Sequence, residues 1–224
     1  MIGSGLASIR EPHAEAVVEG HPLLQLLELY IDDTDFKRLI NQIAVLQARS
    51  NFKSLAILSE LPGEGKSFFT AALALAYARH LPSRVLIVDT TSSSRKPSCF
   101  FQPILGMHIP RCLRSRGLVE PGVIDLISSF QASEDAGPHS DLQFGEYISS
   151  FSHRYDLILV DTAALSAPSH AEIDPVIVAQ HTDSSILLTS HHSLERETLM
   201  RLKHKLQRYG IEPLGTVFNV GPGR

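Results

Sequence analysis

Cysteine is scarce in this sequence of 224 residues, which contains only Cys99 and Cys112. Two cysteines are too few for a disulfide framework or a complete zinc site, and they favour a reducing compartment. Hydrophobic residues make up 43% of the chain and charged residues 20%, which are ordinary values for a protein that buries a sizeable core. The length and composition therefore predict one large globular domain, or at most two small ones.

An excess of basic residues and long apolar runs are lacking as well. The 20 lysines and arginines are outnumbered by 24 aspartates and glutamates, so we expect no nucleic-acid partner. No apolar run approaches the roughly 20 residues that cross a bilayer. The N-terminal segment has neither the basic start nor the long apolar stretch of a secretory signal. These absences predict a cytoplasmic protein.

The chain begins with a segment of mixed composition. Residues 1–22 combine glycine, proline and scattered charge, and we predict a mobile tail there, followed by a single domain over residues 23–224. A helix is predicted from Leu23 to about Arg49, because apolar residues recur at spacings of four and three. Those apolar residues are Leu39, Ile43 and Leu46, and the candidate caps of the helix are Asp32, Asp33 and Thr34.

Short apolar runs then alternate with helical patterns. The runs of strand length are 54–59, 84–89, 155–161, 184–190 and 214–219, and the helical patterns are 66–81, 141–153, 170–181 and 193–209. Such alternation is typical of βαβ units, and nearly continuous apolar strands indicate a sheet covered on both sides. We therefore predict an α/β fold with a mainly parallel central sheet and helices on both faces. The proline-containing region 92–140 is predicted to hold short elements and functional loops.

The segment from Ser59 to Ser67 lies between an apolar strand and an Ala-rich helix, which is the context of a phosphate-binding loop. Gly63 and Gly65 would let the backbone turn tightly, so that its amides point at phosphate oxygens beside the positive end of the helix dipole. Lys66 could reach the β- and γ-phosphates, and the Ser67 hydroxyl could ligate Mg²⁺. The predicted nucleotide-binding residues of this segment are Pro62, Gly63, Glu64, Gly65, Lys66, Ser67 and Phe68.

The match to a phosphate loop is incomplete. The strict pattern G-x-x-x-x-G-K-[ST] has glycine where this chain has Glu60. The alternative interpretation is an ordinary strand–helix turn that contains Gly-Glu-Gly-Lys. The strand–loop–helix context favours the phosphate loop.

Two aspartates end predicted strands. Asp89 is the last residue of the run 84–89 and Asp161 is the last residue of the run 155–161, so both should lie at the carboxyl edge of the sheet, where open parallel sheets bind ligands. A carboxylate there can hold Mg²⁺ or accept a proton from an attacking hydroxyl. The alternative for each is a helix cap or a solvated loop residue, and the phosphate loop favours the functional role.

The motifs in this order resemble those of bacterial tyrosine kinases, cytoplasmic ATP-binding domains that work with membrane polysaccharide co-polymerases and are grouped with the MinD/ParA-type ATPases. The likeness runs from about residue 33 to 220. It rests on LPGEGKS (61–67), VLIVDTTSSSRKP (85–97), GVIDLISS (122–129), LILVDTAAL (157–165) and LGTVFNVG (214–221). The segment FKRLINQI (36–43) resembles the helix that mediates ring assembly in the family.

This resemblance implies a P-loop NTPase three-layer sandwich that binds ATP or ADP with Mg²⁺. It implies catalytic roles for Lys66, Asp89 and Asp161, with Asp89 as the candidate base. It places the metal at Ser67, Asp89 and Asp161, and it assigns the contact with adenine to Asn219.

Several residues depart from the family pattern. Thr91 replaces the second carboxylate of the Asp-x-Asp motif, which predicts weakened metal handling and phosphotransfer. Ala163 and Ala164 replace a Pro-Pro pair, and Leu61 stands where MinD/ParA proteins carry an extra lysine, which tyrosine kinases also lack. The family's Glu-x-x-Arg-x-x-Arg assembly motif is largely lost, which disfavours a closed ring. Its three positions are occupied here by Thr34, Lys37 and Ile40.

The sequence also has no tyrosine-rich tail after residue 219. Its tyrosines lie within or beside predicted elements, at Tyr30, Tyr77, Tyr147, Tyr155 and Tyr209. We therefore expect a degenerate kinase that binds ATP and serves exopolysaccharide or capsule assembly or export. It would form a homo-oligomer and dock on a transmembrane co-polymerase or another export protein at the inner membrane. The alternatives are a MinD/ParA-like ATPase switch that controls localisation or assembly, and a scaffold without nucleotide.

Overall fold

A computed structural model describes residues 21–91, 101, 104–105, 122–128, 143–166, 172–190 and 196–219 of the chain. The predicted tail, residues 1–22, lies outside these residues except for its last two, and helix α1 (Pro22–Asp32) already begins at Pro22. Most of the region predicted to hold loops, residues 92–140, also lies outside them.

The described strands form one six-stranded sheet with the order β3-β2-β4-β1-β5-β6, in which every pair is parallel. The strands are β1 (Ser54–Leu58), β2 (Arg84–Asp89), β3 (Val123–Ser128), β4 (Leu157–Asp161), β5 (Ser184–Ser190) and β6 (Gly215–Asn219). The five predicted strands and the parallel sheet are confirmed. Sequence reasoning did not predict β3 as a strand, because Asp125 interrupts its apolar run, and this edge strand pairs only with β2.

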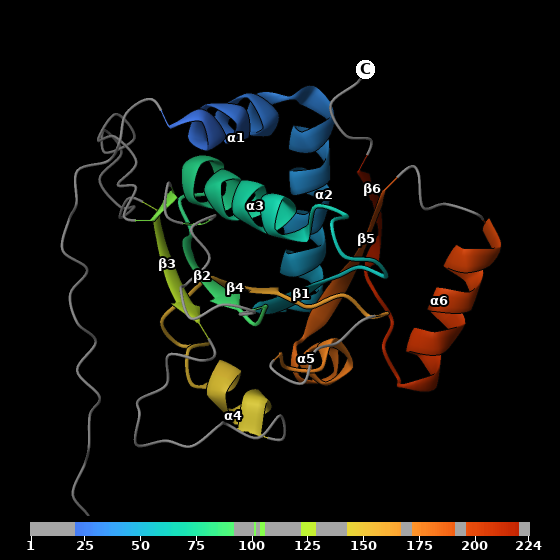
Figure 1. The fold of residues 1–224 in the computed structure, drawn as a ribbon. Helices are drawn as coiled ribbons and strands as arrows, with labels where there is room; N and C mark the ends of the chain where they lie inside the picture. Colours follow the sequence, from blue (N-terminus) through green and yellow to red (C-terminus); the bar gives the residue numbers. More distant parts are fainter. Residues whose placement is uncertain are drawn as a thin grey trace, which may run out of the picture.

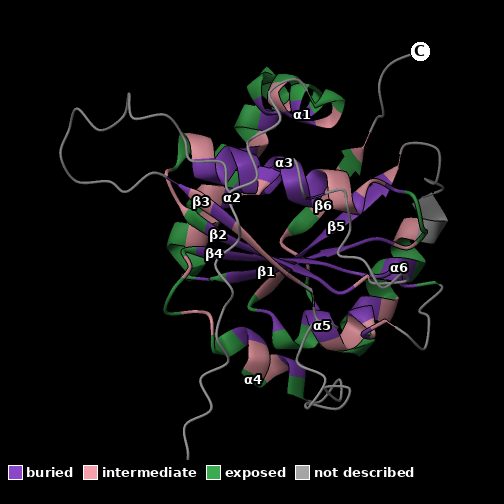
Figure 2. Cartoon of the chain, turned by 60° about the vertical axis from the view of Figure 1, so that its left-hand side comes forward, coloured by how far each residue is buried: buried purple, intermediate pink, exposed green. Residues whose placement is uncertain are grey.

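Helices cover both faces of the sheet, as Figure 1 shows. One face packs against α1, α2 (Thr34–Ser50) and α3 (Lys66–His80), and the other packs against α4 (Phe144–Ser149), α5 (Pro175–His181) and α6 (Arg196–Arg208). Successive strand residues alternate between the two layers: Leu55 and Ile57 join the first core, whereas Ala56 and Leu58 join the second. Figure 2 shows these strands buried between helices whose outer faces are exposed.

The single helix predicted over residues 23–49 is in fact two helices. Asp33 between them has an extended backbone (φ -61°, ψ 141°) and caps α2, because its carboxylate accepts hydrogen bonds from the backbone N–H of Asp35 (2.8 Å) and Phe36 (3.1 Å). Of the three candidate caps, Asp33 is the N-cap of α2. The remaining helices lie within their predicted ranges, and α4 and α5 are several residues shorter than predicted.

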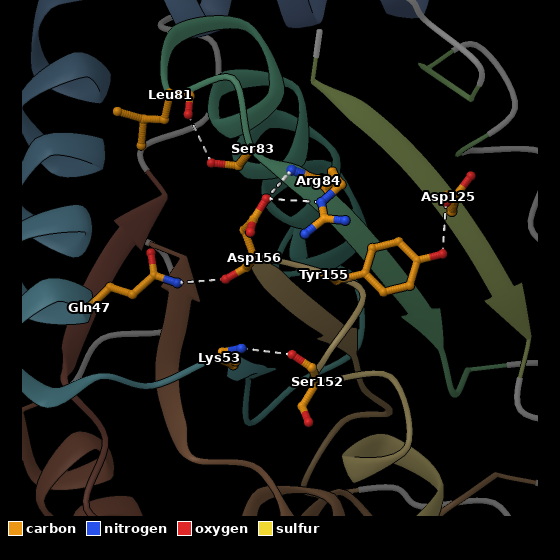
Figure 3. A network of polar contacts seen from close by, with 9 residues as sticks. All are labelled: Gln47, Lys53, Leu81, Ser83, Arg84, Asp125, Ser152, Tyr155 and Asp156. Atoms are coloured by element: carbon orange, nitrogen blue, oxygen red, sulfur yellow. Dashed lines mark hydrogen bonds and ion pairs between the residues drawn. The ribbon is translucent and has the colours of Figure 1, made fainter. Parts of the chain in front are cut away.

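The amino edge of the sheet is fastened by polar contacts, which Figure 3 shows in part. The Asp156 carboxylate accepts a hydrogen bond from the backbone N–H of Arg84 at 2.8 Å, and the Tyr155 hydroxyl donates to Asp125 at 2.8 Å. Asp183 accepts from the backbone N–H groups of Lys53 and Ser54, both at 2.8 Å. These bonds hold the chain where it enters β1, β2 and β5.

Candidate functional site

The ends of β1, β2 and β4 meet in the middle of the carboxyl edge. Asp89 and Asp161 end neighbouring strands and are register partners, so the prediction that both aspartates lie at this edge is confirmed. Both side chains are buried. Thr90 connects the ends of β2 and β4, because its N–H (3.0 Å) and its hydroxyl (2.7 Å) both donate hydrogen bonds to the Asp161 carbonyl.

The predicted phosphate loop connects β1 to α3. Its glycines have left-handed backbones, with φ 79° at Gly63 and 95° at Gly65, a region that side chains with a Cβ rarely adopt. Gly65 is the N-cap of α3, and no described side chain caps the first amides of this helix. These amides therefore keep their donors for an anion at the positive end of the helix dipole. Pro62 lies exposed at the rim of the loop.

Lys66 lies inside the loop rather than in solvent. Its ammonium donates a hydrogen bond to the Ser59 hydroxyl at 2.7 Å, and the residue is 8% exposed. Burial lowers the pKa of Lys66, while the nearby carboxylates of Asp161 and Glu64 act in the opposite direction. The Lys66 amine is thus held inside the loop by a hydroxyl partner.

Ser67 and Asp161 are in direct contact. The Ser67 hydroxyl donates to Asp161 Oδ2 at 2.6 Å. Burial raises the pKa of Asp161 to about 7; the Ser67 bond and Lys66 lower it, and Asp89 raises it further. The second oxygen, Oδ1, is buried and accepts no hydrogen bond from the described residues. A buried carboxylate oxygen without a donor is suited to a cation or to a water that a cation holds.

Asp89 has a different neighbourhood. Its Oδ1 accepts hydrogen bonds from both the N–H (2.9 Å) and the hydroxyl (2.7 Å) of Thr91. Thr91, where the motif resemblance leads us to expect a second carboxylate, supplies hydrogen-bond donors to Asp89.

Asn219 and Glu64 bring the end of β6 to the loop. The Asn219 amide donates to the Glu64 carbonyl at 3.1 Å, and a Cβ on Gly65 would lie 2.4 Å from Asn219 Nδ2. The Glu64 carboxylate is buried and accepts hydrogen bonds at both oxygens. Phe68 is different, since its ring packs edge-on against Tyr30 of α1 with centroids 5.1 Å apart. The Phe68 side chain therefore faces the core. Its backbone forms part of the first turn of α3.

Sequence reasoning missed three groups at this edge: Ser59, Thr90 and the Thr189–Ser190 pair at the end of β5. All of them end or follow strands of the parallel sheet, and that signal could have identified them. In the described part of the chain, no three histidine, cysteine or acidic side chains gather closely enough to hold a metal ion. The site fits Mg²⁺ nonetheless, because this ion is usually bound by one or two carboxylates together with substrate phosphates and water.

Among the described helices, none has the length and apolar character that crossing a membrane requires. The six parallel strands, the flanking helices and the loop entering α3 define the class of the protein: it has the P-loop NTPase fold. Among solved structures, the kinase domain of the Escherichia coli tyrosine kinase Etk superposes with a TM-score of 0.63 at 20% identity, covering 84% of this chain and 75% of that one. The cell division ATPase MinD of Pyrococcus furiosus matches with a TM-score of 0.51 at 21% identity, covering 75% and 72%. At these identities both show the fold alone.

Sequence relatives make the class more specific, although no family model matches the chain. Tyrosine-protein kinase CpsD of Streptococcus pneumoniae is 28% identical over 176 residues, which cover 75% of each protein. Tyrosine-protein kinase wzc of Salmonella typhimurium is 30% identical over 194 residues, which cover 79% of this chain and 25% of the longer relative. The homologues of this chain are bacterial tyrosine-protein kinases, as its motifs predict.

Proposed function

We propose that the chain is an ATP-binding P-loop protein of the bacterial tyrosine-kinase type that acts in exopolysaccharide or capsule assembly or export. The observation that supports this proposal best is the joint placement of Lys66, Ser67 and Asp161 at the loop that enters α3. The kinase homologues support it independently.

The residues have distinct roles in this proposal. The amides from Gly63 to Ser67 and the Lys66 ammonium bind the phosphates of ATP or ADP, and Asn219 contacts the adenine. Ser67 and Asp161 hold Mg²⁺, with Asp89 beside them, and the ion neutralises charge on the phosphates when it is bound. Asp89 is the candidate base for the incoming hydroxyl.

Titration of a fluorescent ATP analogue with Mg²⁺ tests nucleotide binding directly. We expect saturable binding by the wild type and its loss in Lys66→Met, because Lys66 places its ammonium inside the loop. Lys53→Met is the matched control: Lys53 lies at the opposite edge and donates to the Ser152 carbonyl at 2.8 Å. In a thermal melt, MgATP at 100 times its dissociation constant should stabilise the wild type by roughly 2.7 kcal/mol. Equal binding by the wild type and Lys66→Met would contradict the assignment of the loop.

Tyrosine phosphorylation is the finer part of the proposal. Thr91 bonds to Asp89 in place of a second acidic side chain, so we propose that ATP binding is retained while phosphotransfer is weak or lost. The protein purified from its own host should carry no phosphotyrosine, and Thr91→Asp should raise any phosphorylation measured with radiolabelled ATP. Phosphotyrosine on the wild type that is absent from Lys66→Met would overturn the loss of activity.

The proposed kinase type also predicts a binding partner and an oligomeric state. We propose that the chain binds a transmembrane co-polymerase or export protein from the cytoplasmic side, as a homo-oligomer that does not close into a ring. Two positions of the assembly helix support this: Lys37 forms an ion pair with Asp32 of its own chain at 2.9 Å, and Ile40 is buried in the core. Sedimentation velocity with and without MgATP tests it, and a discrete closed ring would contradict it.

The MinD/ParA-like switch is the less supported alternative. Leu61, at the position of the extra lysine, is 43% exposed and carries no amine for a neighbouring active site. Dimerisation that depends on ATP, measured by light scattering, would favour the switch over the kinase type.

A further inference from the structure

Glu64 accepts hydrogen bonds from within the phosphate loop and from the ends of two strands. Its Oε2 accepts a hydrogen bond from the backbone N–H of Leu61 at 2.9 Å, within the loop itself. Its Oε1 accepts from the backbone N–H of Ser190 at 3.0 Å and from the Thr189 hydroxyl at 3.3 Å, at the end of β5. Its carbonyl accepts from Asn219 at the end of β6. Glu64, which is 3% exposed, thus connects the loop to the ends of β5 and β6.

The two glycines beside Glu64 explain why such a connection matters. Gly63 and Gly65 both have positive φ, and glycine loses more conformational freedom on folding than any other residue. A loop with glycine on either side of one residue has many alternative shapes, and only a few of them turn the amides toward a common centre. The bonds of the Glu64 side chain select one of these shapes before any ligand arrives.

Electrostatics alone would disfavour a carboxylate at this position. A negative group in a phosphate loop repels the phosphates, so removing its charge should strengthen binding if charge were its only effect. The hydrogen bonds act in the opposite direction. Each carboxylate oxygen faces a backbone N–H, and a glutamine would have to turn its NH₂ group toward one of these donors. Loss of the hydrogen bonds should therefore weaken nucleotide binding, whereas loss of the charge should strengthen it. The substitution Glu64→Gln distinguishes these two effects.

We propose that Glu64 is a positioning residue that holds the phosphate loop in its binding shape through Leu61 and Ser190, and that nucleotide affinity depends on it despite its negative charge. This inference rests on the proposed nucleotide binding. Its carboxylate contacts no phosphate; it acts through the backbone of the loop.

The test compares Glu64→Gln with Glu60→Gln. Glu60 lies four residues earlier in the same loop, and its buried Oε2 accepts no hydrogen bond from the described residues, so its substitution removes the same charge without breaking such a bond. Titration of fluorescent ADP with Mg²⁺ should show at least about a tenfold higher Kd for Glu64→Gln, because a loop that samples its binding shape less often binds more weakly. Glu60→Gln should leave the Kd unchanged or lower it.

A milder variant covers the case in which Glu64→Gln does not fold. Thr189→Val removes one of the three donors to the carboxylate and should raise the Kd about threefold, since a single hydrogen bond from a hydroxyl at 3.3 Å is lost. Tighter or unchanged binding in Glu64→Gln, or in Thr189→Val where Glu64→Gln does not fold, would overturn the proposal.

Hydrogen exchange separates this inference from the proposed function. Without nucleotide, the backbone amides of Leu61, Gly63, Glu64 and Gly65 should exchange faster in Glu64→Gln than in the wild type, while the amides in the middle of α3 keep their protection. Failure of the wild type to bind ADP would refute the nucleotide proposal and leave this measurement intact. Unchanged loop exchange in Glu64→Gln would refute the role of Glu64 even if the wild type binds nucleotide.

Discussion

Aspartates lie at both edges of the sheet, but their surroundings differ. At the amino edge, Asp156 and Asp183 are exposed. Asp156 accepts a hydrogen bond from the backbone N–H that begins β2 (Figure 3), and Asp183 accepts from those of Lys53 and Ser54, where β1 begins. At the carboxyl edge, Asp89 and Asp161 are 1% and 0% exposed. Asp161 keeps one buried oxygen to which no described residue donates.

We interpret the aspartates of the amino edge as side chains that stabilise the fold, and those of the carboxyl edge as side chains suited to a ligand. An exposed carboxylate with backbone donors stabilises the folded chain at little cost in desolvation. A buried carboxylate with an unsatisfied oxygen costs stability, and such costs are typical of functional sites. If this interpretation is right, substitutions at the two edges should change stability in opposite directions.

The largest expected effect is that of Asp161→Asn on binding. The amide keeps the size of the side chain and can still accept from Ser67, but it carries no charge for Mg²⁺. We expect the Kd for ATP in the presence of Mg²⁺ to rise about 100-fold, towards the value measured in EDTA. At pH 8 the variant should be as stable as the wild type or more stable, because a buried charge is gone. A large loss of stability without a change in the magnesium effect would assign Asp161 to the fold instead.

The pH dependence of stability sharpens the same comparison. The folded-state pKa of Asp161, about 7, lies above its ordinary value of 3.8, so the folded protein binds more protons than the unfolded chain between these values. The contribution of Asp161 to stability is therefore fully present below about pH 4 and is lost as the pH rises through 7. Urea denaturation of the protein without nucleotide, from pH 4.5 to 8, should show this fall, and Asp161→Asn should show a smaller one. Identical slopes for the two proteins would contradict the raised pKa.

Asp183→Ala is expected to have the next largest effect, with the opposite outcome. It leaves the N–H groups of Lys53 and Ser54 without their acceptor, so the free energy of unfolding in urea should fall by about 2 kcal/mol. The Kd for ATP should not change, because this residue lies at the far edge of the sheet. Asp183→Asn keeps an acceptor oxygen and should lose less. A nucleotide effect as large as that of Asp161→Asn would remove the distinction between the edges.

The carboxyl edge was more predictable from sequence than the amino edge. Strand ends in a parallel sheet meet at one side, so Asp89, Asp161 and the loop before Lys66 followed from three apolar runs and their last residues. The contacts of Asp183 and Glu64 were not predictable in this way. They depend on how loops far apart in the chain approach one another, for which local periodicity carries no signal. The break at Asp33 was missed for a related reason, since an extended residue between two helices does not interrupt the apolar pattern.

The smallest expected effect distinguishes two glycines of the same loop. Gly63→Ala and Gly65→Ala both place a Cβ on a left-handed backbone, which costs about 1 kcal/mol. At Gly63 the added Cβ meets nothing within 4 Å, whereas at Gly65 it lies 2.4 Å from Asn219 Nδ2. Gly65→Ala must therefore also displace the Asn219 amide from the Glu64 carbonyl, and we expect it to destabilise the protein by about 1 kcal/mol more than Gly63→Ala.

A double-mutant cycle measures this last difference. In the Asn219→Ala background the clash is absent, so Gly63→Ala and Gly65→Ala should lower the free energy of unfolding by equal amounts. A difference that persists in this background would place its cause in the backbone of the loop. A difference that disappears would show that the end of β6 presses on the phosphate loop through Asn219. The carboxyl edge would then be held together by the residues that are expected to bind the ligand, whereas at the amino edge the fold is held by residues outside the proposed site.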